Sequence, residues 1–150
     1  MDRLIAALDG QFSQLHQDSV RLVEAVSVDE LFRRPSTANS SSIKSCGEEL
    51  LRSAGTIEQT FGGITANLWD DPFEWTQPET LAAPERILEY LNEVEATRKR
   101  GFELFKSDSE LTKKIMSPSG ETQLMPLLLD TLVRAAHYLG RARATAELMH

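Results

Sequence analysis

The residues with the clearest chemical potential lie in the stretch from 127 to 149. This stretch contains Arg134, His137, Tyr138 and Arg141, in a chain whose formal net charge is −7. Histidine is a common metal ligand, and the arginine side chain can hold an anion through charge-assisted hydrogen bonds. The stretch therefore predicts either a metal site or a site for an anionic ligand.

A helix over 122–149 would give this stretch a face that packs in a core. At 100° per residue, one arc of that helix collects apolar and small side chains. The residues on this arc are Leu124, Leu128, Thr131, Ala135, Leu139, Ala142 and Ala146. Arg134, His137, Tyr138 and Arg141 fall on the strip beside this arc.

A second face of the same helix carries Ala136, Gly140 and Ala144, which recur every four residues. Small residues at this spacing allow another helix to approach closely, so they predict a contact with a second subunit and a homodimer. The alternative is a solvated face on which alanine serves only as a good helix former.

The rest of the chain predicts three further long helices, over 2–26, from about 42 to 61, and over 84–106. Gly62-Gly63 weakens the second of these, so we expect a kink there, with the helix resuming where Ile64 and Leu68 continue the same stripe. Ser27-Val28-Asp29-Glu30 reads as a capping box that starts a short helical turn. The segment 69–78, with both tryptophans, reads as an ordered loop, and Pro118-Ser119-Gly120 as a tight turn. Since no strand pattern is found, the sequence predicts an all-α four-helix bundle in one domain over 1–150.

The composition narrows the class of protein. There are 23 acidic and 16 basic side chains, which argues against a nucleic-acid partner or an anionic membrane surface. Cys46 is the only cysteine, so neither an internal disulfide nor a thiolate zinc cluster can form. The sequence shows no signal peptide and no apolar run long enough to cross a membrane, so we expect a soluble cytoplasmic protein.

The passage His137-Tyr138-Leu139-Gly140-Arg141 resembles the HHxGQ signature that ends the last helix in the DinB/YfiT-like superfamily. Arg34-Pro35 before a polar loop and the helix start at Ser42-Ile43 resemble the same family. The resemblance implies a four-helix bundle with up-down-down-up topology and a long connection between helices 2 and 3. It also implies, for many members, a divalent metal held by three histidines, and for some a transferase or isomerase activity that uses low-molecular-weight thiols.

The positions that match the family's metal ligands carry other residues. On the last helix they are Arg134 and Tyr138, and on the second helix the position is Ser53 or Glu49, depending on the register. An arginine is always protonated and cannot ligate a metal. We therefore expect no metal and no cofactor, with a zinc or nickel ion as the alternative that the family offers.

A different metal site stays open as an alternative. His16, Cys46, Glu49 and His137 carry side chains that can ligate zinc, although their spacing does not demand a site.

The arginines predict a polar region inside the bundle. Arg98 falls in the middle of the apolar stripe of its helix, and Arg134 would point to the same region. Buried arginines need acidic partners, for which Glu49, Glu58 and Glu95 are available.

Two outcomes are open for this region: an internal ion-pair network, or a pocket for a small anionic ligand. The residues that would line such a pocket are Glu49, Ser53, Arg98, Arg134, His137 and Tyr138. Three functions follow as hypotheses: a metal-free small-molecule or partner-binding bundle, a metal- or thiol-dependent transferase or isomerase, and a purely structural dimer.

Overall fold

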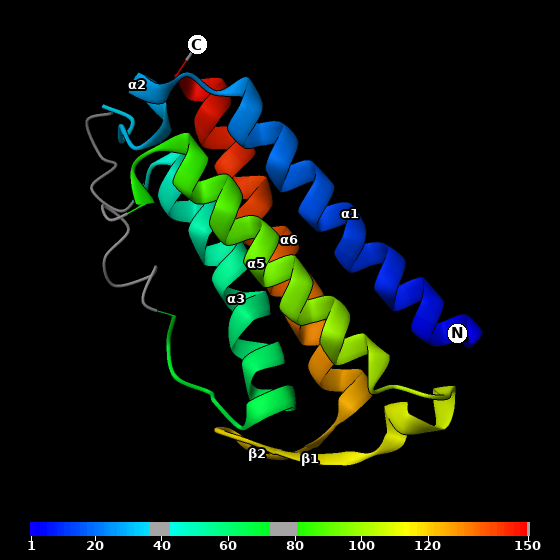
Figure 1. Ribbon diagram of the computed structural model, residues 1–150. Coiled ribbons are helices and arrows are strands. Elements are labelled where there is room, and N and C mark those ends of the chain that lie inside the picture. Colours follow the sequence, from blue (N-terminus) through cyan, green and yellow to red (C-terminus); the bar gives the residue numbers. More distant parts are fainter. Residues whose placement is uncertain (37–42, 73–80, 150) are drawn as a thin grey trace.

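Four long helices packed together form most of the protein (Figure 1). The computed structural model describes residues 1–36, 43–72 and 81–149. The long helices are α1 (Arg3–Ala25), α3 (Cys46–Ala66), α5 (Pro84–Glu103) and α6 (Leu124–Leu148). Shorter elements are α2 (Val28–Leu31), the 3₁₀ helix η2 (Asp108–Thr112), and an antiparallel hairpin of β1 (Lys114–Ser117) and β2 (Gly120–Gln123).

Each long helix packs against two others. Helix α3 lies against α5 and α6, and α1 lies against the same two helices from the other side. In Figure 1, α1 and α6 finish at the end of the molecule where α3 and α5 begin. The neighbours α3 and α5 therefore run in the same direction, which requires the long connection between them.

Gly62-Gly63 does not end the second long helix, because α3 continues through both glycines to Ala66. The helix ends instead at Asn67, whose left-handed backbone (φ 54°) lets the Leu68 amide donate to the Gly62 carbonyl at 3.0 Å. The following chain then folds back over the helix, and a Cβ on Gly63 would lie 2.4 Å from ring atoms of Trp69. The two glycines thus provide room for the returning chain rather than a break.

The start of α3 also differs from the expectation. Ser45 accepts a hydrogen bond from the Glu48 amide while the Glu48 carboxylate accepts one from the Ser45 amide, so the capping box forms here. At Ser27 the short helix α2 forms as predicted, but the side chain of Ser27 makes no capping hydrogen bond. The predicted polar loop at 36–42 and the tryptophan loop at 69–78 lie partly outside the described residues, Trp75 included.

The prediction that the chain has no strands is also wrong. Strands β1 and β2 pair Lys114 with Gln123 and Ser117 with Gly120 around the predicted tight turn. Gly120 has φ 112°, a conformation that glycine adopts readily. Each strand has only four residues, too few for an alternating apolar pattern to stand out in the sequence.

The core draws side chains from all four long helices. At its centre the rings of Phe12, Phe61 and Phe102 meet with centroids 5.4–5.7 Å apart. Among the residues that the structure describes, no helix is both long and apolar enough to span a membrane.

Candidate functional site

The expected site between α3 and α6 is closed by polar contacts. The Ser53 hydroxyl donates to the Ala135 carbonyl at 2.8 Å. One turn earlier on α3, Glu49 is 3% exposed and its Oε1 accepts from Nε of Arg141 at 3.2 Å. Ser53 and Glu49 are therefore both engaged in contacts with α6.

Arg134 does not point into the bundle, contrary to the prediction. Its Nε donates to Asp130 at 3.0 Å, one turn earlier on the same helix, and both side chains are substantially exposed. The partner is thus an aspartate on the surface rather than a buried glutamate. The expected pocket lined by both Arg98 and Arg134 is not formed by these contacts.

Arg98, on α5, is buried where α5 packs against α1. Its guanidinium is 1% exposed and pairs with Asp9 and Glu95. It also lies over the rings of Phe12 and Phe102, 5.9 and 5.2 Å from their centroids. Of the two outcomes left open for this region, an internal ion-pair network is present at Arg98.

His16 extends this network, since its Nδ1 lies 3.9 Å from Oε2 of Glu95. Burial lowers the pKa of His16 below its ordinary value of 6.5, Lys99 and Arg98 lower it further, and Glu95 opposes them. His16 is therefore a neutral neighbour of the ion pair at neutral pH.

The lowered pKa of His16 predicts a pH dependence of stability. Between the lowered pKa and 6.5 the unfolded chain binds more protons at this residue, so stability should fall as the pH drops through that window. Above pH 6.5 His16 is mostly neutral in both the folded and the unfolded chain, so its titration should not change the free energy of unfolding there. Urea unfolding at several pH values measures this effect. As the pH falls through the window, the free energy of unfolding should decrease less steeply for His16→Gln than for the unchanged chain. The same decrease in both proteins would contradict the prediction.

The other candidate ligands lie apart from one another. Cys46 is fully buried, and burial raises the pKa of its thiol to about 12. His137 is exposed and meets the Tyr138 ring edge-on, with centroids 5.5 Å apart. No group of three or more histidine, cysteine or acidic residues with metal-site geometry occurs within residues 1–36, 43–72 and 81–149.

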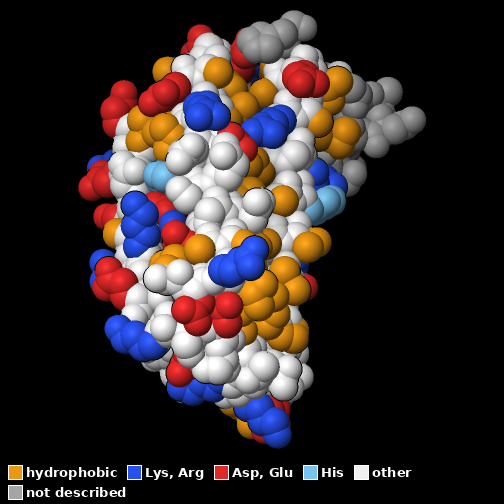
Figure 2. Space-filling view, turned by 90° about the vertical axis from the view of Figure 1, so that its right-hand side faces the viewer, with side chains coloured by type: hydrophobic (Ala, Val, Ile, Leu, Met, Phe, Trp, Pro, Cys, Tyr) orange, Lys and Arg blue, Asp and Glu red, His pale blue; other side chains and the backbone are white. Residues whose placement is uncertain are grey.

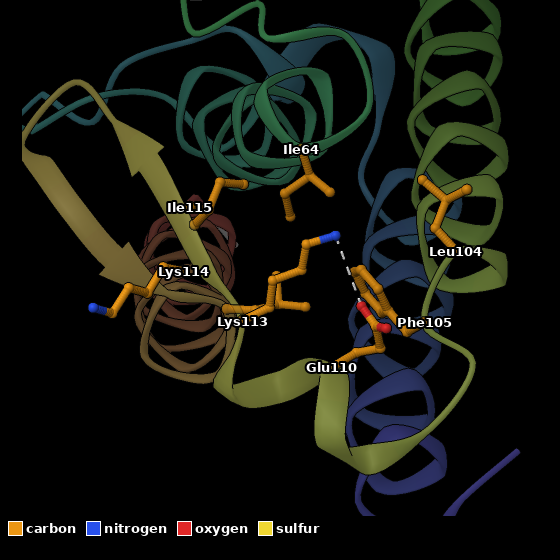
Figure 3. A pocket seen from close by; sticks show the side chains of 8 residues that line it. Ile64, Leu104, Phe105, Glu110, Lys113, Lys114 and Ile115 are labelled. Carbon is orange, nitrogen blue, oxygen red and sulfur yellow. Dashed lines mark ion pairs between the residues drawn. The ribbon is translucent and has the colours of Figure 1, made fainter.

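A pocket of about 130 Å³ lies instead at the far end of the bundle, where the hairpin meets the ends of α3 and α5 (Figure 3). Its wall is mostly apolar. The lining residues are Ile64, Leu104, Phe105, Glu110, Lys113, Lys114, Ile115 and Leu124. We call this space the end pocket.

One ion pair, between Lys113 and Glu110, lies at the end pocket. Figure 3 shows the Lys113 side chain extending towards Ile64 and Phe105, with its ammonium facing Glu110, while Lys114 points away. The Lys113 Nζ lies 3.9 Å from Glu110 Oε2, which is too long for a hydrogen bond, and the Lys113 side chain is 73% exposed. Exposed pairs of this kind contribute about 0–1 kcal/mol, so an incoming anion can replace Glu110 at little cost.

Sequence reasoning did not find the end pocket, because it depends on where the hairpin lies. The turn at Pro118-Ser119-Gly120 was the available signal, since Ile115 and Thr122 on either side of it pair in the hairpin. The contact between Leu124 and Lys113, whose main-chain groups hydrogen-bond at 2.9 Å, then fixes the hairpin against α6.

Comparison of the chain with known family models, curated proteins and solved structures finds no match.

Proposed function

We propose that this chain is a metal-free ligand-binding bundle of the DinB/YfiT type, and that its ligand is a small amphipathic anion held in the end pocket. The helix directions support the family's up-down-down-up topology, and the connection between α3 and α5 has the required length. Two of the residues at positions that match the family's metal ligands support a metal-free bundle, because Arg134 pairs with Asp130 and the Ser53 hydroxyl donates a hydrogen bond to the Ala135 carbonyl.

The observation that carries the proposal is one weakly paired lysine at an apolar pocket. The apolar wall favours a hydrocarbon group, and the Lys113 ammonium favours a carboxylate or a similar head group. The volume of about 130 Å³ is below the ~300–1,000 Å³ of sites for drug-sized ligands. The ligand class is therefore a short- to medium-chain carboxylate rather than a long lipid.

The expected affinity is modest. Burying about five or six methylene groups at ~0.8 kcal/mol each supplies roughly 4–5 kcal/mol. This is an upper limit, because binding also costs the ligand its translational and rotational freedom, so we expect a dissociation constant of about 1 mM or weaker.

Titration with octanoate, followed by the backbone amide signals in NMR spectra, tests the proposal. We expect saturable shifts at Ile115, Leu124 and Ile64, because these residues line the pocket. Lys113→Gln should weaken binding about twofold to fivefold, as expected for an exposed charge contact, whereas Lys114→Gln should leave it unchanged since Lys114 points away. Octanol, which lacks the charge, should bind the unchanged chain and the Lys113 variant equally.

Two results would contradict the proposal. Equal effects of the two lysine variants would remove the specific role of Lys113, and the absence of any saturable shift would remove the site. Near-stoichiometric zinc or nickel in the purified protein, measured by elemental analysis, would overturn the metal-free assignment separately.

A further inference from the structure

The first turn of α1 is capped by a residue from a distant part of the chain. The carboxylate of Asp108, on η2, accepts hydrogen bonds from the main-chain amides of Ile5 and Leu4 at 3.1 and 3.2 Å. In return, the Asp108 amide donates to the carboxylate of Asp2 at 2.9 Å. Asp2 stands at the N-cap of α1, but its side chain makes no capping hydrogen bond to its own helix. We call these three hydrogen bonds the α1–η2 cap.

The α1–η2 cap satisfies groups that every helix leaves open at its start. The first four amides of an α-helix have no partner within the helix, and a carboxylate beside them also interacts favourably with the helix dipole. The first turn of α1 contains no acidic residue, so Asp108 supplies this charge. The arrangement is reciprocal, as in a capping box, although Asp2 and Asp108 are 106 positions apart. The start of α1 and η2 therefore hold each other in place.

Helix η2 connects the α1–η2 cap to the end pocket. Asp108 begins η2 and Lys113 follows its last residue, and the Lys113 amide donates to the Glu110 carbonyl at 3.0 Å. Since the Lys113 carbonyl accepts from the Leu124 amide, the segment is tied to α1 at one end and to α6 at the other. Between these ties, Leu111 is 3% exposed and packs in the core. Loss of the cap would therefore loosen the Asp108 end of η2 without releasing the whole segment.

The charged side chains of the end pocket and its apolar wall come from different elements. Glu110 lies on η2 and Lys113 directly follows it, whereas Ile64 belongs to α3, Ile115 to β1 and Leu124 to α6. A shift of η2 therefore moves the ion pair and leaves the apolar wall in place.

We propose that Asp108 is a positioning residue for the end pocket, and that the α1–η2 cap and a bound carboxylate stabilise each other. The inference rests on the proposed binding of a small amphipathic anion. The intact cap holds η2 so that Lys113 meets the carboxylate of the ligand. By thermodynamic linkage, the bound carboxylate makes opening of the cap rarer by the factor by which the cap strengthens binding.

Titrations of Asp108→Ala with octanoate and with octanol test the positioning. Octanoate should bind about twofold to threefold more weakly, and no more weakly than to Lys113→Gln, because the exposed charge contact contributes little in total. Octanol should bind as it does to the unchanged chain, since the apolar wall stays in place. Asp108→Asn keeps one acceptor oxygen and should restore part of the affinity for octanoate. The matched control Asp18→Ala removes another aspartate of α1, one that pairs with Arg143 on α6, and should leave the affinity unchanged.

Amide hydrogen exchange followed by NMR tests the reciprocal effect. Figure 2 views the molecule from the side on which α1 begins, and charged side chains of both signs cover its lower end, where Figure 1 places η2 and the hairpin. The hydrogen bond between Leu4 and Asp108 is exposed there, so opening of the cap admits water to the amide. Saturating octanoate should slow exchange at Leu4 and Ile5 by the same factor of about two to three, and octanol should not.

Reference amides on α6 separate this effect from a general stabilisation of the bundle. Ala136, Gly140 and Ala144 are exposed in the middle of α6, away from the cap and the end pocket. Their exchange should slow less than that of Leu4 and Ile5 when octanoate is added.

Two results would overturn the inference. If Asp108→Ala weakens the binding of octanoate and octanol equally, or of neither, Asp108 does not position Lys113. If exchange at Leu4 and Ile5 slows no more than exchange on α6, the cap and the ligand are not linked. In both cases octanoate still binds the unchanged chain. The absence of saturable binding to the unchanged chain would instead remove the proposed function, and the linkage with it.

Discussion

Replacing Arg98 with methionine should lower the free energy of unfolding by about 3–5 kcal/mol, because the change leaves a buried carboxylate without its cation. Arg98 is 1% exposed, and its guanidinium lies between the carboxylates of Glu95 and Asp9. The Asp9 side chain is 35% exposed and can turn to water, whereas that of Glu95 is only 10% exposed. Most of the effect should therefore come from Glu95.

Urea unfolding of three variants separates the charge from the packing. Arg98→Met alone should lose the full amount, and Arg98→Met combined with Glu95→Leu should recover most of it, since an apolar pair needs no charge partner. Arg134→Met should change stability by less than about 1 kcal/mol, because its pair with Asp130 is exposed. A small effect of Arg98→Met, or no recovery in the double variant, would contradict a buried charge network.

The contrast between these two arginines shows how far the sequence can be used to place a charged side chain. Arg98 interrupts an apolar stripe of α5, so its burial and its partner Glu95, three residues before, could be predicted. Arg134 lies at the edge of its stripe, where a rotation of a few tens of degrees decides between core and solvent. Its ion pair with Asp130 is an ordinary i, i+4 pair on a helix surface. The sequence pattern allows this pair as well as it allows a buried partner.

The four long helices were predictable because each carries its apolar residues at helical spacing over at least 20 residues. The end pocket was not, since it is formed by residues from α3, α5, the hairpin and α6. Nothing in the local sequence around Ile64 or Leu104 indicates that the hairpin lies beside them. A site of this kind depends on tertiary packing, whereas Ser53 and Glu49 were named only from a resemblance in sequence to a known family.

Replacing Phe61 with alanine should destabilise the protein by about 3–5 kcal/mol, through loss of buried area and the cavity that remains. Phe61 is fully buried, and its ring meets Phe12 edge-on at 5.4 Å and Phe102 at 5.7 Å. The ring also lies directly over Gly101, where an added Cβ would be 2.5 Å from Cδ1 of Phe61. The absence of a side chain at Gly101 is therefore what admits the ring between α3 and α5.

This contact predicts that the effect of Gly101→Ala changes sign with the residue at position 61. In the unchanged chain the added methyl group should destabilise by about 1–3 kcal/mol, because it must displace a ring in a packed core. After Phe61→Ala the same methyl group partly fills the cavity and favours the helix, so it should stabilise by up to about 1 kcal/mol. Gly10→Ala, with nothing within 4 Å, should stabilise both backgrounds equally. Thermal or urea unfolding of these variants measures the coupling, and additive effects of Gly101→Ala and Phe61→Ala would mean that the ring and the glycine do not share one space.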